Sequence, residues 1–397
     1  MKIVLLGKSF VIARKILEIS PSIKLIVIDN SEYLKDDSNN TKNMSKFISY
    51  VTGADLVAEV APKLIVDKDI VGVIPAFERT VTDANLLAKK LNLSRIGDIG
   101  AEIFRDKYKL REFCEKIGIN QPPYKLIHNV EELRNYFSGK PLIYKPISLA
   151  GSVGVVKISE ESTIDSEYSF TEAEMKRENS SELLGIAEEY VPGSEFSCEY
   201  VVESGNVVFR NITKKFKFDN GYFVESGHLV PGIVNGIAQH EIFESLDKIV
   251  SEAQIGTAIL HSEWIVTHDN QPVLVEIAGR RPGDRIVDLI SLAYGFDFLW
   301  EYCLTMIGEN TSYQGISLKF AEQKYFEISS GEVISINGIE NFANIKFELD
   351  VHEGDIIPEV KSSEDRRGYF ILSNNDFFAL EANVRKANKL LTISTKS

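Results

Sequence analysis

The pattern that most constrains the fold is an alternation of short apolar runs with helical stretches over the first hundred residues. The runs of strand length are residues 2–7, 25–30 and 71–77, and the stretches with apolar side chains at helical spacing are residues 11–19 and 82–93. Short strands that alternate with helices are typical of a parallel sheet covered by helices. We therefore expect a Rossmann-like α/β domain at the amino terminus.

Neither of the common phosphate-binding loops follows the first of these strands. Gly7-Lys8-Ser9 resembles the end of a P-loop, but Lys2 stands where that loop requires a glycine. The dinucleotide fingerprint also fails, because KSFVIA follows Gly7 without a further glycine. We expect Gly7 only to let the chain turn at the end of the strand.

The composition argues against several classes of protein. The 397 residues carry a formal net charge of −14, which phosphate backbones and anionic lipids repel. The chain has no apolar run of about 18 residues, and its start is too short and too charged for a signal peptide. Its three cysteines are far apart, so neither a disulfide framework nor a structural zinc site is expected. We predict a cytoplasmic protein without nucleic-acid or membrane partners.

Three further segments have a predicted secondary structure that bears on the domain plan. Residues 101–117 have the apolar spacing of one amphipathic helix. Residues 159–182 are polar and acidic, which favours a surface loop with one short helix. Residues 377–391 are predicted to form a late helix.

Lys145 is the first residue that suggests a phosphate site. It ends an apolar run and precedes residues 148–154, a loop of small side chains. Such a loop lets backbone N–H groups approach a phosphate, and a lysine at its base neutralises the same charge. The alternative is a plain turn between two strands.

Glu263 and Glu276 suggest a metal site. They lie on the two strands of a β-hairpin predicted for residues 262–279. Strand alternation places both carboxylates on one face, with Val273 and Val275 on the other. Two convergent carboxylates suit a divalent cation that also binds phosphates. The alternative is a pair of glutamates that face solvent.

Three arginines follow the hairpin within six residues. Arg280, Arg281 and Arg285 lie among glycines just beyond the strand end, which in an acidic chain suggests anion binding. The alternative is a solvated basic turn that pairs with Asp284 and Asp288, most plainly for Arg285, which is three residues from Asp288.

Two other positions also allow two interpretations. Glu78 follows an apolar run and either meets a substrate ammonium group or begins a helix. Lys214 and Lys215 either bind phosphate or form a solvated pair.

In their order along the chain, these motifs resemble the ATP-grasp superfamily, and within it carboxylate–amine ligases similar to L-amino-acid ligases. The resemblance covers essentially the whole chain and implies an α/β fold (α+β overall). The implied parts are a Rossmann-like pre-ATP-grasp domain at residues 1–100, a small ATP-grasp lobe with the phosphate loop at 101–190, a large lobe with the magnesium site at 191–310, and a C-terminal α+β domain at 311–397.

The resemblance also implies which residues bind ATP. RDKYKLREF and IYKP match the segments that carry two nucleotide lysines, and SLAGSVG matches the loop that closes over the phosphates. AEEYVPGSEFS is similar to the hinge strand, whose backbone binds adenine, and to the carboxylate that holds the ribose. The implied residues are Lys107, Lys145, Gly151, Ser152, Gly154, Glu188, Tyr190, Val191 and Glu195.

Catalytic groups follow from the same resemblance. Glu263 and Glu276 match the paired magnesium ligands, and Arg280 matches an arginine that stabilises the transferring phosphoryl group. His228, in ESGHLVPG, resembles a histidine near the reacting carboxyl group. Ala278 departs from the pattern, because many members have asparagine there, which leaves the number of magnesium ions open. The residues expected near the substrates are Glu78, Arg281 and Asp284.

The implied function is an ATP-dependent ligase that forms an amide or peptide bond through an acyl phosphate. Its cofactors are ATP and Mg²⁺, with Mn²⁺ as a substitute, its substrates are a small carboxylate and an amine, and a homodimer is allowed. One alternative is a ligase with another acceptor, either a carrier-protein thiol or a carboxylation substrate. The other is a non-catalytic nucleotide-binding protein, which the presence of both glutamates disfavours.

Overall fold

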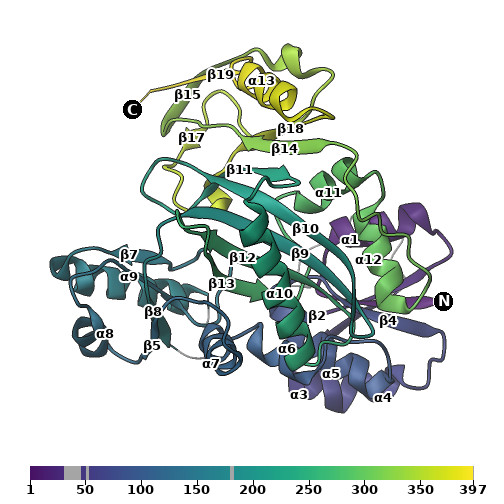
Figure 1. Cartoon of the computed structure of the whole chain (residues 1–397). Coiled ribbons are helices and arrows are strands. Elements are labelled where there is room, and N and C mark those ends of the chain that lie inside the picture. Colours follow the sequence, from purple (N-terminus) through teal and green to yellow (C-terminus); the bar gives the residue numbers. More distant parts are fainter. Residues whose placement is uncertain (31–45, 51–52, 179–182, 397) are drawn as a thin grey trace.

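A computed structural model describes residues 1–30, 46–50, 53–178 and 183–396 (Figure 1). The amino-terminal sheet has the strand order β3-β2-β1-β4, and all of its pairings are parallel. Its strands are β1 (Lys2–Leu6), β2 (Lys24–Asn30), β3 (Lys46–Tyr50) and β4 (Ile70–Pro75). This arrangement confirms the parallel sheet predicted from the alternating pattern.

Alternate residues of β1 enter two different cores, which explains why the strand is apolar throughout. Ile3 and Leu5 pack with α1 (Phe10–Ile19), whereas Val4 and Leu6 pack with α4 (Ala61–Leu64) and α5 (Val81–Leu91). A strand buried on both faces has no polar side to show in its sequence. The sheet is therefore covered by helices on both faces.

The helix predicted over residues 101–117 is wrong in one respect, because the structure has two helices there. They are α6 (Asp98–Ile103) and α7 (Lys107–Ile117), which begins after Asp106. The Asp106 carboxylate accepts the N–H groups of Tyr108 and Lys109, an N-cap that starts a new helix. As a result, Lys107 lies in the first turn of α7.

A small lobe follows, built on an antiparallel sheet of order β5-β8-β6-β7. Its strands are β5 (Tyr124–Ile127), β6 (Leu142–Pro146), β7 (Val156–Ile158) and β8 (Gly185–Glu189), and its helices are α8 (Val130–Tyr136) and α9 (Ile164–Arg177). The prediction of a surface loop with one short helix is wrong, since α9 spans 14 residues. Its buried side chains are Ile164, Thr171 and Met175. So few buried positions in a mostly polar segment give a weak helical pattern in the sequence.

The largest sheet has eight strands in the order β13-β12-β9-β10-β11-β14-β18-β16, all antiparallel. The strands are β9 (Ser194–Glu203), β10 (Asn206–Lys217), β11 (Glu225–Val230), β12 (Ala258–Val266), β13 (Pro272–Ala278), β14 (Phe320–Tyr325), β16 (Lys346–Leu349) and β18 (Gly368–Asn374). Since β11 pairs with β14, the sheet continues across residue 310.

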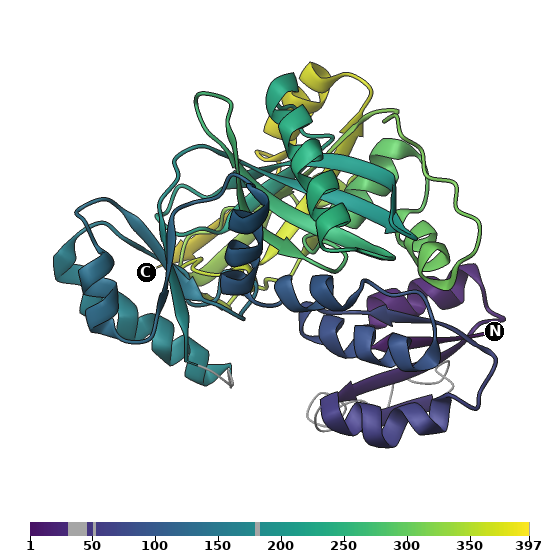
Figure 2. The ribbon, with the colours of Figure 1, turned by 60° about the horizontal axis from the view of Figure 1, so that its bottom comes forward.

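Helices cover both faces of this sheet. α10 (Gly236–Glu252) packs with Tyr200 and Leu260, whereas α11 (Ile286–Tyr294) and α12 (Phe298–Ile307) pack with Val201 and Ile259 from the same two strands. α12 also contacts β4 of the amino-terminal sheet. In both views the small lobe lies at one end of the molecule, away from the amino-terminal sheet (Figures 1 and 2).

The carboxyl-terminal region adds α13 (Phe377–Ala387) and a sheet of order β17-β15-β19. Its strands are β15 (Gly331–Asn337), β17 (Ile356–Ile357) and β19 (Thr392–Lys396). The late helix predicted at residues 377–391 is confirmed, and it ends four residues early. All three cysteines are buried and free. Within the described ranges, no helix has the length and apolar character needed to span a bilayer.

Candidate active site

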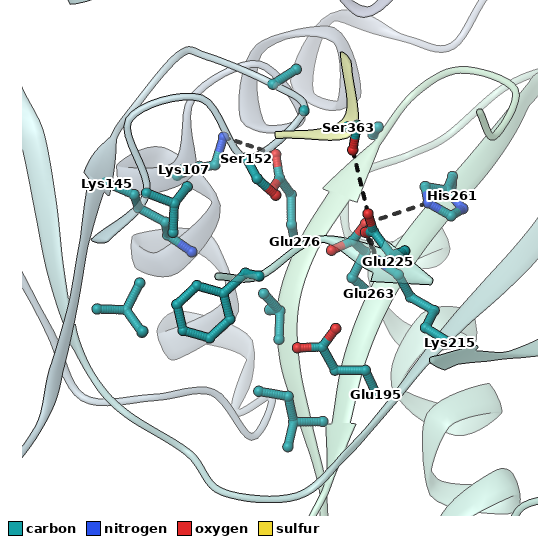
Figure 3. Close-up of a pocket in the computed structure, with 18 of the residues that line it drawn as sticks. Lys107, Lys145, Ser152, Glu195, Lys215, Glu225, His261, Glu263, Glu276 and Ser363 are labelled. Carbon is teal, nitrogen blue, oxygen red and sulfur yellow. Dashed lines mark hydrogen bonds and ion pairs between the residues drawn. The ribbon is translucent and has the colours of Figure 1, made fainter. Parts of the chain in front are cut away.

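A cavity of about 300 Å³ lies between the small lobe and the large sheet (Figure 3). It brings together residues from distant segments of the chain, from Glu78 to Ser363. The sequence-predicted residues that line it are Glu78, Lys107, Lys145, Gly151, Ser152, Glu188, Tyr190, Val191, Glu195, His228, Glu263, Glu276, Arg280 and Asp284. Gly154 and Arg281 are not among its lining residues.

The predicted hairpin is present as β12 and β13, and Glu263 pairs directly opposite Glu276. The register then shifts, because Trp264 pairs with Leu274 and leaves Val275 as an extra residue. Val275 consequently lines the cavity beside the two glutamates. The prediction that strand alternation turns Val275 away from them is therefore wrong.

Lys107 and Lys145 reach the cavity from different elements. Lys107 Nζ lies 2.9 Å from Glu276 Oε1 and donates to the carbonyl oxygen of Leu149, at 2.6 Å. Lys145, near the end of β6, lies 2.9 Å from Glu188 Oε2. Burial lowers the pKa of Lys145, whereas for Lys107 burial is outweighed by Glu276 and Glu78, which raise its pKa. Figure 3 shows both lysines on one side of the cavity.

Glu188 is buried between two cations. In addition to Lys145, it accepts Arg111 Nε at 2.9 Å, and Arg111 Nη2 donates to the carbonyl oxygen of Val275 at 2.7 Å. Burial alone would raise the pKa of Glu188, but Arg111 and Lys145 outweigh it and lower the pKa to about 2. The Glu188 side chain is therefore committed to an internal ion pair.

The strand end after Glu188 leaves a backbone donor available. The Tyr190 N–H donates to the carbonyl oxygen of Pro141 at 2.9 Å. In the described part of the chain, no hydrogen bond uses the N–H of Val191, which lines the cavity. Glu195, farther along the cavity wall, forms an ion pair with Lys217.

Lys215 is a cavity residue that the sequence left undecided. Its ammonium group lies 2.9 Å from Glu263 Oε1 and 3.0 Å from Glu225 Oε1. Its neighbour Lys214 points to the other face of β10, where its ammonium group lies 4.3 Å from the centre of the Phe196 ring. Strand alternation could have separated the two lysines, but it could not say which one faces the cavity.

Glu78 begins a short helix, as one of its two interpretations predicted, and it also lines the cavity. Its carboxylate lies 3.0 Å from Arg280 Nη2 and 3.0 Å from Arg105 Nη1. Arg280 is thereby held in the cavity by a buried carboxylate from another domain. Arg105 gave no signal in the sequence, because it lay inside a predicted helix.

Asp284 and His228 lie near each other at the far side of the cavity. Asp284 pairs with Arg366 Nη2 at 2.6 Å and accepts the Tyr325 hydroxyl at 3.0 Å. His228 Nε2 lies 3.9 Å from Asp284, and its Nδ1 lies 3.3 Å from the side-chain oxygen of Gln323. Burial lowers the pKa of His228, so this imidazole is neutral at pH 7.

The loop after β13 has an unusual backbone, and its three arginines have different surroundings. Asp284 and Arg285 both have positive φ angles, of 49° and 61°, a strain that is concentrated at functional sites. Arg281 lines a second cavity rather than the first, and its Nη1 donates to the carbonyl oxygen of Pro282. Arg285 pairs with Asp288 at 3.6 Å, as the salt-bridge interpretation predicted.

The carboxylates suit a magnesium ion bound jointly with phosphates. No group of three or more His, Cys, Asp or Glu side chains within the described ranges forms a complete metal cage. Magnesium keeps several waters and commonly binds one or two carboxylates together with substrate phosphates. The ammonium groups of Lys107 and Lys215 each contact one of these two glutamates, at 2.9 Å in both cases.

Comparison with known proteins agrees with the resemblance inferred from the motifs. Residues 138–288 match the family described as ATP-grasp domain. An alanine–anticapsin ligase from Bacillus subtilis (strain 168) is 27% identical over 226 residues, which are 53% of this chain and 48% of that protein. The chain thus spans about half the length of this relative.

Two further comparisons cover more of the chain. An L-arginine-specific L-amino acid ligase of Bacillus subtilis is 23% identical over 317 residues, 77% of this chain and 76% of that protein. The crystal structure of an L-amino acid ligase from Bacillus licheniformis has a TM-score of 0.81 at 19% identity and covers 100% of this chain and 99% of that one. The expected fold class, a mixture of helices and sheets, is confirmed.

Proposed function

Residues 138–288 form an ATP-grasp domain, and from this premise we propose that the protein is an ATP- and Mg²⁺-dependent ligase. It joins a small carboxylic acid to an amine, and both substrates are amino acids. The names of the relatives support this substrate class, since they are an alanine–anticapsin ligase and L-amino acid ligases.

The observation that carries the proposal is the arrangement of charge around one cavity. Glu263 and Glu276 stand opposite each other on the hairpin, and Lys107 and Lys145 approach from the other side. Phosphoryl transfer requires positioning and charge neutralisation more than covalent help from the protein. A carboxylate pair facing two lysines supplies both for a nucleotide triphosphate with its cation.

The nucleotide would lie along the small lobe. The Val191 N–H is available for an adenine nitrogen, and Glu195 lines the cavity farther along, where its carboxylate can accept the ribose hydroxyls. Gly151 and Ser152 have positive φ angles, of 69° and 61°, in the loop that would cover the phosphates. A loop of this kind turns its N–H groups inward more readily than an extended segment does.

The proposed reaction has two steps. The substrate carboxylate attacks the γ-phosphorus of ATP, which forms an acyl phosphate and releases ADP. The amine nitrogen then attacks the acyl carbon, and inorganic phosphate leaves. When bound at Glu263 and Glu276, magnesium would neutralise part of the negative charge of the phosphates.

Arg280 would act on the transferring group, and Glu78 would hold its guanidinium in place. A planar guanidinium can bind two phosphoryl oxygens at once. His228 lines the same cavity and would lie near the reacting carboxyl group in the second step. The loop at residues 148–154 would exclude water, which otherwise hydrolyses the acyl phosphate.

The defining experiment is a screen of amino-acid pairs for release of ADP and phosphate, with the product identified by mass. We expect ADP release to require an acid and an amine together, with a product heavier than either substrate. A ligase with a thiol acceptor would instead need a carrier protein, and a carboxylating enzyme would need bicarbonate. Absence of ADP release with every acceptor would overturn the proposal.

Arg280 provides a sharper test. Arg280→Ala and Arg280→Lys should each lower turnover by about 10²-fold or more, with little change in ATP affinity, because the contact forms chiefly in the transition state. The matched control is Arg281→Ala, since that side chain lines the second cavity. Normal turnover of Arg280→Ala, or a larger loss in the control, would contradict this role.

A further inference from the structure

The two proposed metal ligands are held very differently. The ion pair of Glu276 with Lys107 has its contact at Oε1. The Glu263 carboxylate contacts both Lys215, at 2.9 Å, and His261 Nε2, at 3.6 Å, and the contact atom is again Oε1. Across the described residues, no hydrogen bond uses Glu263 Oε2 or Glu276 Oε2.

Behind His261 lies a carboxylate that does not reach the cavity. Glu199, on β9, is 0% exposed, and its two oxygens accept four donors. Oε1 accepts the Ser197 hydroxyl at 2.9 Å and His261 Nδ1 at 3.0 Å, while Oε2 accepts Asn211 and Thr213, each at 2.7 Å. Glu199 forms no ion pair with a lysine or arginine of the described chain, and His261 is the titratable side chain that donates to it.

A fully buried carboxylate needs an explanation, because its desolvation costs several kcal/mol that an apolar side chain would avoid. The geometry supplies one. Strand β12 lies between β9 and β13, so that His261 pairs with Glu199 on one side and lies two residues before Glu263 on its own strand. The imidazole is thereby fixed between the two carboxylates.

The hydrogen-bond pattern determines which ring nitrogen is the donor. An ionised carboxylate only accepts, so Nδ1 carries a proton and donates to Glu199. Nε2 then faces Glu263 at 3.6 Å, which is within ion-pair contact but longer than a hydrogen bond. Lys215 contacts the same Oε1 atom, at 2.9 Å.

We infer that Glu199 and His261 are positioning residues, which hold the Glu263 carboxylate by Oε1 so that Oε2 remains available to a divalent cation. The inference rests on the proposed function, in which Glu263 and Glu276 bind the magnesium of MgATP. Partners that orient a metal ligand from behind typically change metal affinity by about 10- to 100-fold when removed.

The test uses Mn²⁺ as the probe, with the full chain and ADP, and follows the free-ion signal by electron paramagnetic resonance. Glu199→Gln and His261→Asn should each weaken Mn²⁺ binding by about 10- to 100-fold. Binding of ADP in EDTA, measured by calorimetry, should not change, because neither residue meets the nucleotide. General damage to the fold would instead weaken both ligands.

The His261→Asn variant is chosen because it should still fold. An asparagine amide can replace Nδ1–H and keep Glu199 satisfied, while the contact with Glu263 is lost. Glu322→Gln is the matched control, since Glu322 is a buried carboxylate of the same sheet outside the cavity. The double variant of Glu199 and His261 should bind Mn²⁺ no more weakly than the weaker single variant, because the two act as a unit.

The outcomes separate this inference from the proposed function. If the wild-type chain binds neither Mn²⁺ nor ADP, both are overturned. If the wild type binds Mn²⁺ with ADP and a folded His261→Asn variant binds it equally well, only the positioning role is overturned. Equal weakening in Glu322→Gln would also overturn that role, since it would trace the loss to replacement of any buried carboxyl group of the sheet.

Discussion

The small lobe and the large sheet neutralise their buried charges in opposite ways. In the small lobe, Glu188 is closed off by Lys145 and Arg111, and both of its oxygens are used. On the large sheet, Glu263 and Glu276 each have one oxygen that accepts no hydrogen bond in the part of the chain that the structure describes, and their ion-pair contacts are made by Oε1. A closed ion pair contributes to the fold, whereas a half-satisfied carboxylate remains available to a ligand.

The largest expected effect is on the stability of the protein when the closed ion pair of the small lobe is broken. Glu188→Gln leaves Lys145 and Arg111 buried without their carboxylate, which should cost about 3–5 kcal/mol at pH 7. The pKa of Glu188 is lowered to about 2 from an ordinary 4.5, so its contribution is present above pH 4.5 and is lost as the pH falls toward 2. The difference in the free energy of unfolding between wild type and variant should therefore narrow over that interval.

Urea unfolding at a series of pH values measures this gap. Glu131→Gln, an exposed carboxylate of the same lobe, is the control and should change the free energy of unfolding by less than about 0.5 kcal/mol. A gap that does not depend on pH would mean that Glu188 is not the closed ion pair described here.

The second effect belongs to the large sheet and should appear in turnover. Glu276→Gln replaces a carboxylate with an amide, which is a poor ligand for a hard cation. Turnover at saturating magnesium should fall by about 10²-fold or more. Glu252→Gln on α10 is a surface control. Turnover within about threefold of wild type would place the metal elsewhere.

The smallest expected effect is on nucleotide binding, and it concerns a residue that belongs to both the small lobe and the cavity. Lys145 belongs to the closed ion pair but also lines the cavity. Lys145→Ala should therefore weaken the binding of ATP by about tenfold and leave the binding of adenosine nearly unchanged. Calorimetry with both ligands measures the difference, and Lys125→Ala, an exposed lysine of β5, is the control. Equal weakening of ATP and adenosine would give Lys145 a purely structural role and sharpen the contrast.

The elements that local periodicity determines could be predicted from the sequence. The parallel sheet and the hairpin with Glu263 opposite Glu276 depend on patterns within short segments, and both are present. The resemblance identified Lys107 and Lys145, which the structure brings into the same cavity. Their roles there remain predictions.

Other features depend on long-range pairing or on local irregularity, which alternation cannot show. Arg105 meets Glu78 only because the break at Asp106 turns the chain. Lys215 meets Glu225 through the pairing of β10 with β11, and a register shift turns Val275 into the cavity. Strand alternation alone does not determine these contacts.

The continuous eight-stranded sheet has a consequence for synthesis of the chain. β11 is complete at residue 230, but its partner β14 begins at Phe320, so the strand that carries His228 has an open edge until ninety more residues have been made. Open edges invite pairing with other chains. The last quarter of the protein therefore closes the sheet as well as extending it. A nascent chain interrupted before β14 would present its half-built site to its neighbours on the polysome.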